Sequence, residues 1–495
     1  MLFNSVDFLI FLSLAVVAYY AIPYRFRTPY LLAISYYFYM CWKAEYIVLV
    51  VISTLSNYAG AIWMERASKQ SLKKLVLAFC LIVNLGMLVL FKYLNFFGAS
   101  VNRALDALNI MAGVPAFDIL LPVGISFFTF KSVSYAIDAY NGRIKPERNL
   151  VRFAVYVAFF PALLAGPIDR AKNLLPQFSQ KFDFDYNRVT NGLLLILWGF
   201  FKKIVIADRL ALLFNPMYAN PENYNPGTLL LSCYAFTFQI YCDFSGYSDI
   251  AIGSALLMGH QLMENFHRPY FATSVRDFWR RWHISLTSWF RDYLYIPLGG
   301  NRVSKFRWYV NIMIVFLVSG LWHGANWTFI AWGGLHGLFF VLSRRSAAFR
   351  EKMAGRFRLS ALPGVHRLVR VLLTFHLVVF AWIFFWAKSI SDAFLVVGKL
   401  WTGFKGLLTF SVDFQTIARL GWISPELKLR EIAVAVATIA VMEVIHFLQR
   451  DTSFPAYISA RPAWMRWALY FAMVWVILIF GKYGTNSQEF IYFQF

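Results

Sequence analysis

Long apolar runs separated by short basic loops recur along the whole chain. The first run, Val6–Ile22, and a late one, Trp464–Phe480, each hold 17 residues of which one is charged. A helix of this length approaches the roughly 30 Å thickness of the hydrocarbon core of a bilayer. No basic segment precedes the first run and no small-residue cleavage site follows it, so we expect a retained membrane helix rather than a secretory signal. The pattern predicts an all-α, polytopic integral membrane protein.

The basic loops set the expected orientation. Pro23–Pro29, Glu65–Lys74 and Ser343–Ser360 are rich in Lys and Arg, and loops of this kind face the cytoplasm. Counting the apolar runs between them places the N-terminus on the periplasmic side of the inner membrane and the last six residues, "FIYFQF", outside. We expect roughly eleven spanning or near-spanning segments in a single integral domain over residues 1–495.

Composition fits this picture. Of 495 residues, 59% are hydrophobic and 15% charged, and the formal net charge is +22. In a soluble protein this charge would favour a nucleic-acid partner. Here the cations lie in the loops, so membrane lipids are the expected partners and nucleic acid is not. The four cysteines show no CxxC spacing, and no metal site is expected.

Three segments depart from a regular spanning pattern. Phe159–Arg170 has two prolines and a glycine in an apolar stretch, which predicts a broken or re-entrant helix surrounded by protein. Phe201–Leu210 alternates cations with apolar residues, as interfacial helices do. Tyr309–Leu342 lies between two basic regions and is too short for two full crossings of about 20 residues each. We therefore expect a pair of tilted or shortened helices, with their turn near Gly320–Asn326.

Four ionisable residues stand in apolar surroundings. His323 lies in "VSGLWHGANW" and His336 in "WGGLHGLFF", while Asp243 and Asp249 lie in "YCDFSGYSDIAIG". Ionisable groups within a membrane are expensive and mark function by default. The alternatives for the histidines are a hydrogen bond between helices, a position near the membrane interface, or tight helix packing marked by the glycines. Asp243 and Asp249 are candidate orienting groups, and a histidine or an arginine could be the partner of Asp243.

One further segment combines aromatic rings with cations. In "VRDFWRRWHISLTSWFRDYLYIPLGGNR", Val275–Arg302, arginines and aromatic residues flank His283 on both sides. Alone, this pattern is typical of an amphipathic segment at a membrane surface.

Taken together, these segments resemble the membrane-bound O-acyltransferase family, in particular its bacterial alginate O-acetylation branch. The resemblance covers essentially the whole chain and is strongest in Leu121–Tyr140, Tyr241–Gly253, Asn265–Arg302 and Leu317–Gly337. It implies a ring of membrane helices around a central tunnel that joins the two faces.

The resemblance also implies the site. The essential histidine of the family matches His323, and a second recurrent polar position matches His283. His323 would be the general base that accepts the hydroxyl proton during acyl transfer, and burial would keep it neutral. His283 would orient a substrate or assist proton transfer. A backbone amide near Gly324 or the side chain of Asn326 is the candidate oxyanion stabiliser, and His336 is a supporting candidate.

The implied acyl donor is cytoplasmic acetyl-coenzyme A, a substrate rather than a tightly bound cofactor. Its phosphates would be attracted to Arg276, Arg280, Arg281 and Arg291. The alternative is that these arginines set topology and bind anionic lipid.

The expected function is transfer of an acetyl group from acetyl-coenzyme A across the inner membrane for O-acetylation of an exported cell-envelope polysaccharide, alginate first. Peptidoglycan, cellulose and D-alanylation of teichoic acid are alternatives. The chain has no GxSxG elbow, so a periplasmic or membrane-tethered SGNH or serine-hydrolase-like partner is expected to receive the acetyl group. A secondary transporter is the alternative from a different class, although no inverted repeat is evident.

Overall fold

A computed structural model describes residues 1–110, 113–357, 361–408, 428–449, 452–484 and 488–493. Its regular elements are all helices, and these ranges contain no strand, which confirms the all-α class. The chain divides into two compact units. The first unit comprises Met1–Leu197 and Tyr247–Glu264, and the second comprises Trp198–Gly246 and Asn265–Phe495. The expectation of a single domain stays a prediction.

Six helical segments among the described residues are long and apolar enough to cross a membrane. They are Ala44–Arg66, Gln70–Ala107, Tyr186–Ala219, Pro363–Trp386, Leu429–Gln449 and Ala463–Phe480, and Val6–Ala21 is a shorter apolar helix. In Ala463–Phe480 only 6% of the apolar window is buried within the protein, so its side chains are available to lipid. The chain is a multi-pass membrane protein. The count of eleven segments stays a prediction.

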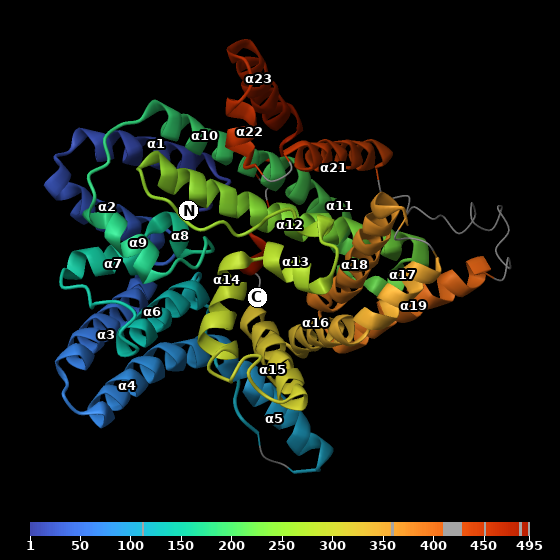
Figure 1. Cartoon of the computed structure of the whole chain (residues 1–495), viewed down its shortest axis with the longest axis horizontal. Helices are drawn as coiled ribbons and strands as arrows, with labels where there is room; N and C mark the ends of the chain where they lie inside the picture. The colour runs from blue at the N-terminus through green and yellow to red at the C-terminus, as the bar shows by residue number, and fades with distance from the viewer. Residues whose placement is uncertain (111–112, 358–360, 409–427, 450–451, 485–487, 494–495) are drawn as a thin grey trace. The chain divides into compact units, whose positions relative to one another are not determined.

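The described part of the first unit contains helices α1 to α9 and most of α10. They are α1 (Val6–Ala21), α2 (Tyr24–Met40), α3 (Ile47–Arg66), α4 (Gln70–Leu88), α5 (Leu94–Ala107), α6 (Ile125–Tyr140), α7 (Leu150–Ala158), α8 (Phe160–Leu163), α9 (Ala171–Leu174) and α10 (Tyr186–Phe200). Helices α3, α4 and α6 pack side by side (Figure 1). Ser53 joins them, because its hydroxyl lies 2.7 Å from Asn84 Oδ1 and 2.8 Å from Ser132 Oγ. Such hydrogen bonds between helices are common in membrane proteins.

The predicted break in the first unit is present. Helix α7 ends at Ala158, α8 covers only Phe160–Leu163, and the chain then turns without helical structure. Every residue from Phe159 to Arg170 is buried. The irregular backbone is therefore enclosed by protein, as the cost of exposing unpaired amides to lipid requires.

The second unit contains the remaining described helices and a part of α12 (Pro226–Leu257), whose residues are divided between the units. They are α11 (Asp208–Ala219), α13 (Val275–Arg281), α14 (Ile284–Phe290), α15 (Lys305–His323), α16 (Trp327–Arg345), α17 (Ala347–Arg356), α18 (Pro363–Trp386), α19 (Ile390–Leu408), α21 (Leu429–Gln449), α22 (Phe454–Ser459) and α23 (Ala463–Phe480). A π-helical turn, Phe201–Ala207, joins α10 to α11.

Helices α15 and α16 form a hairpin whose turn lies where the sequence predicts it (Figure 1). Each helix has 19 residues, so of the two expected alternatives the shortened one is wrong, and the tilted one stays a prediction. Charged and polar residues at the outer ends of the pair, which resemble loops in the sequence, continue the helices. Glycines let the two backbones touch, because a Cβ built on Gly320 would lie 2.2 Å from the carbonyl oxygen of Phe329 and one on Gly333 would lie 2.2 Å from that of Phe316.

The expectation of an interfacial helix at Phe201–Leu210 is also wrong. These residues lie inside the helical stretch Tyr186–Ala219, and all ten are buried. The local pattern wrongly indicates exposure to the interface, because the positive charge of Lys203 is paired inside the protein. Its Nζ lies 2.8 Å from Asp208 Oδ1 and 2.6 Å from Oδ1 of Asp243, which is on another helix.

Candidate active site

His323 is the last residue of α15 and faces the interior of the second unit, where it is 2% exposed. The centroid of its ring lies 5.0 Å from that of Trp332 on α16, 5.5 Å from that of Phe385 on α18 and 5.5 Å from that of Tyr492. Close packing sets this position, since a Cβ on the next residue, Gly324, would lie 2.1 Å from the Phe329 ring.

His283 is fully buried and precedes α14 in the left-handed backbone region, with φ +43°. A non-glycine residue there is strained, and such strain collects at functional sites. Asn265 holds the conformation: its carbonyl oxygen accepts from the Ile284 N–H at 2.9 Å, and its side-chain oxygen accepts from Ser285 Oγ at 2.6 Å.

Both ring nitrogens of His283 lack a hydrogen-bond partner among the residues that the structure describes. Burial lowers the pKa of His283 from 6.5 to about 3, because a charged ring would lose its hydration. His283 is therefore neutral near pH 7, with a ring that an incoming polar group can use.

The structure brings the two predicted catalytic histidines together although 40 positions separate them. Their ring centroids are 6.2 Å apart. The aromatic rings packed around them come from several elements of the second unit, and we use the name histidine chamber for this packed set of side chains: His283, His323, Phe244, Trp322, Trp332, Phe385 and Tyr492. An aromatic lining of this kind excludes water and favours neutral imidazole.

His336 is on α16, and the ring of Trp332 lies between it and His323. Its Nδ1 accepts a hydrogen bond from Trp279 Nε1 at 3.3 Å, and its ring centroid lies 5.0 Å from that of Trp332. Trp332 thus contacts both His323 and His336. His336 is therefore one aromatic ring away from His323, and the supporting role expected for it stays a prediction.

The two expected orienting carboxylates have different surroundings. Asp243 is buried in α12, and its partners are Lys203 Nζ at 2.6 Å and the Ile491 N–H at 2.8 Å. The sequence leaves this partner open between a histidine and an arginine, whereas the structure gives a lysine. Asp249 is half-buried in the part of α12 that belongs to the first unit.

Asn326 caps α16. Its side-chain oxygen accepts from the Thr328 N–H at 3.1 Å, and its amide group donates to the carbonyl oxygen of Lys388 at 3.0 Å. Through these two hydrogen bonds the Asn326 side chain stabilises the turn after His323 and caps the N-terminus of α16. The sequence does not predict this structural role, and the role of oxyanion stabiliser stays a prediction.

The four arginines differ in their pairing. Arg276 and Arg280 are exposed and one helical turn apart on α13. Arg281 is half-buried and paired with Asp277 at 2.9 Å, while Arg291 is exposed and paired with Asp292 at 2.8 Å. Helix α13 is attached to the site by its other face, where Trp279 contacts His336 on α16.

Sequence reasoning named none of the aromatic residues of the chamber, and Tyr492 is the most distant of them along the chain. Its ring centroid lies 5.5 Å from that of His323 and 6.2 Å from that of His283. The signal was the aromatic character of "FIYFQF", but nothing local in that run shows which surface it covers.

No cluster of three or more His, Cys, Asp or Glu side chains suited to a metal ion occurs in the described ranges. Cys41 is exposed and Cys80, Cys233 and Cys242 are buried, all as free thiols.

Comparison with known proteins gives a consistent result. The model of the membrane-bound O-acyltransferase family matches residues 144–387. A probable alginate O-acetylase AlgI of Pseudomonas putida is 36% identical over the full length of both chains. A probable alginate O-acetylase AlgI of Azotobacter vinelandii is 40% identical over 81% of this chain and 78% of its own. A peptidoglycan O-acetyltransferase of Helicobacter pylori is 31% identical over 100% of this chain and 98% of its own.

Proposed function

This chain belongs to the membrane-bound O-acyltransferase family and is an O-acyltransferase, and we propose that it transfers an acetyl group from cytoplasmic acetyl-coenzyme A to a hydroxyl group for export. The observation that carries the proposal is the pair of buried histidines, His323 and His283, with ring centroids 6.2 Å apart in an aromatic chamber.

His323 acts as the general base. The acceptor hydroxyl oxygen attacks the thioester carbon while His323 takes the hydroxyl proton. The carbon–sulfur bond then breaks, the thiolate of coenzyme A leaves, and the histidine returns the proton to it. General base catalysis of this kind contributes roughly 10²–10⁴-fold in rate. His283 is close enough to orient the acceptor or the thioester, and its ring nitrogens, which have no partner among the described residues, support that role.

The donor enters from the face that carries Arg276 and Arg280. Both side chains are exposed on α13, and guanidinium groups bind phosphates with charge-assisted hydrogen bonds. Arg281 and Arg291 are paired with aspartates, so they contribute less to donor binding than the other two. The alternative role of these arginines is to set the topology of the chain and to bind anionic lipid.

The acceptor is an exported cell-envelope polysaccharide, alginate first, since relatives named as probable alginate O-acetylases align over most or all of the chain. A relative named as a peptidoglycan O-acetyltransferase also aligns over the full length, which keeps peptidoglycan as the second candidate. The protein works in the bacterial inner membrane with its N-terminus in the periplasm. An SGNH or serine-hydrolase-like partner receives the acetyl group first and passes it on to this polysaccharide, which is the final acceptor.

Liposomes that contain the purified protein separate this proposal from transport. Acetyl-coenzyme A is added outside, and the SGNH or serine-hydrolase-like partner is supplied together with mannuronate oligomers or a peptidoglycan disaccharide. The proposal predicts acceptor-dependent release of free coenzyme A and an acetyl ester on the partner or on one of the two saccharides. Solute flux without thioester cleavage would contradict it and favour a secondary transporter.

A further inference from the structure

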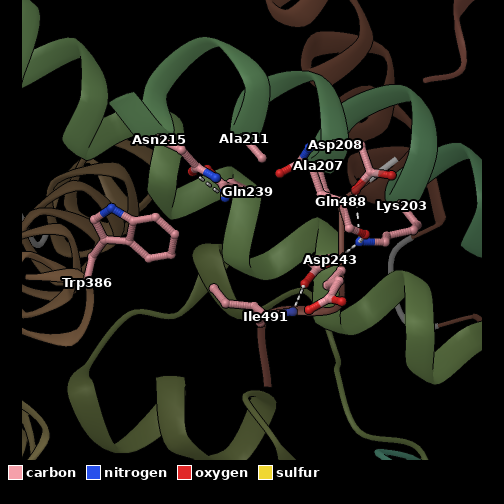
Figure 2. Close-up of a pocket in the computed structure, with 11 residues that line it drawn as sticks. Lys203, Ala207, Asp208, Ala211, Asn215, Gln239, Asp243, Trp386, Gln488 and Ile491 are labelled. Carbon is pink, nitrogen blue, oxygen red and sulfur yellow. Dashed lines mark hydrogen bonds and ion pairs between the residues drawn. The ribbon is translucent and has the colours of Figure 1, made fainter. Parts of the chain in front are cut away.

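A buried cluster of three charges lies in the second unit, and the acyl-transfer chemistry does not use it. Lys203, Asp208 and Asp243 have side chains that are 3%, 1% and 6% exposed. Figure 2 shows the lysine between the two carboxylates, which come from α11 and α12. Buried charges carry a desolvation penalty that their mutual attraction often does not recover, so a reason beyond stability is worth seeking.

The cluster holds the C-terminal segment. Lys203 Nζ donates a hydrogen bond to the carbonyl oxygen of Gln488 at 3.0 Å, and Asp243 Oδ2 accepts one from the Ile491 N–H at 2.8 Å (Figure 2). Upstream, the Lys482 N–H donates to the carbonyl oxygen of Ile204, on the same π-helical turn as Lys203. We call residues 488–493 the C-terminal strap.

The strap supplies a wall of the histidine chamber. Ile491, which Asp243 holds, is followed by Tyr492, whose ring faces both histidines. Phe244, which follows Asp243 in α12, has its ring centroid 4.6 Å from that of Tyr492 and 4.6 Å from that of His283. Two adjacent residues of α12 thus hold the strap: Asp243 binds its backbone, and Phe244 contacts the ring of Tyr492.

We propose that Lys203 and Asp243 are positioning residues that seat the C-terminal strap, so that Tyr492 closes one wall of the chamber formed around His283 and His323. The inference rests on the proposed function only in assigning catalysis to those histidines. The position of the strap itself can be measured without any activity.

The cluster allows a matched pair of substitutions. Its formal charge is −1, so neutralising either aspartate leaves one lysine facing one carboxylate. Asp243→Ala removes the acceptor of the Ile491 N–H. Asp208→Asn leaves that acceptor and the Lys203 bond to Gln488 in place, and its amide oxygen can still accept from the backbone of Gln488, which the Asp208 carboxylate also contacts. Asp243→Asn retains an acceptor oxygen and is the conservative variant.

The first measurement follows the strap directly. Ile491 is 3% exposed, and Ile491→Cys in a Cys41→Ser background places a thiol there while the other cysteines stay buried. Maleimide labelling of the introduced thiol in the purified protein should be slow in this background alone and with Asp208→Asn, much faster with Asp243→Ala, and slow again with Asp243→Asn. Equal labelling rates with Asp243→Ala and Asp208→Asn would overturn the proposal.

The second measurement links the strap to acyl transfer. Asp243→Ala should lower kcat by about 10²-fold, the loss expected from a wall misplaced by about 1 Å, with little change in KM for acetyl-coenzyme A. Deleting residues 485–495 should lower kcat by a similar factor. In that shortened chain, Asp243→Ala should cause no further decrease in kcat, and a further decrease would contradict a positioning role. Absence of acyl transfer in the parent protein would count against the proposed function, and the labelling result would still test the strap.

Discussion

The contact between α15 and α16 at Gly333 sets the position of His323, and a single methyl group should disturb it. In Gly333→Ala, the new Cβ would lie 2.2 Å from the carbonyl oxygen and 3.0 Å from the carbonyl carbon of Phe316. Both atoms belong to the backbone of α15, so no side chain can rotate away to make room.

The expected cost follows from that distance. A Cβ essentially never approaches another heavy atom closer than 3.0 Å, so the helices must part locally by roughly 1 Å, and overpacking of this kind costs about 1–3 kcal/mol. The preceding residue, Trp332, contacts His323, so the shift reaches the chamber. A displacement of about 1 Å in a catalytic group costs on the order of 10²-fold in rate.

Gly334→Ala is the matched control. Its Cβ would meet only Leu317 Cδ2, at 3.6 Å, and alanine is about 1 kcal/mol better than glycine within a helix. We expect Gly333→Ala to lower the Tm of the detergent-solubilised protein and kcat by about 10²-fold, while Gly334→Ala raises the Tm slightly and leaves kcat unchanged. Equal Tm and kcat in the two variants would refute the argument from backbone contact.

Three further predictions concern residues around the chamber and beyond it. Asn326→Ala should cost about 1 kcal/mol of stability because the helix cap is lost, and this should appear as a lower Tm. Asn326→Asp should restore the Tm. A fall in kcat at unchanged Tm would favour the oxyanion role instead. Arg276→Glu with Arg280→Glu should raise KM for acetyl-coenzyme A and weaken its salt dependence, and unchanged kinetics in correctly inserted protein would favour lipid binding. Burial lowers the pKa of His260 from 6.5 to about 3, so at this residue the unfolded chain alone takes up a proton below pH 6.5, and His260 contributes about 1.4 kcal/mol to the loss of stability by pH 5.5. His260→Gln should remove this share of the fall in Tm, and an unchanged pH dependence would count against it.

Sequence alone was sufficient for the fold class, and it named two histidines that the structure brings together. Apolar runs with helical length predict the all-α membrane protein, and the turn between α15 and α16 lies where basic flanks and glycines indicate it. His323 and His283 were predicted from motif resemblance, and the structure places their rings close together. Those features follow from local pattern and motif, which a single sequence carries.

The errors arose where the partner of a residue is distant in sequence. The local alternation predicts a membrane interface for Lys203 because it cannot show the carboxylate of Asp243, 40 positions away. The place of Tyr492 beside the histidines could not be predicted, because these contacts join segments about 170–210 positions apart. Helix length at α15 and α16 was underestimated because charged residues at helix ends resemble loops.

The rate of acetyl transfer with and without the His323 imidazole decides whether this side chain is the general base. Coenzyme A release from acetyl-coenzyme A is measured at saturating donor and acceptor for the parent, for His323→Ala and for His336→Ala, after equal expression and insertion are verified. If His323 is the general base, His323→Ala lowers kcat by about 10²–10⁴-fold with donor binding retained, and His336→Ala, one ring further away, loses less. Full acetyl transfer by a correctly inserted His323→Ala protein would show that His323 is not the general base.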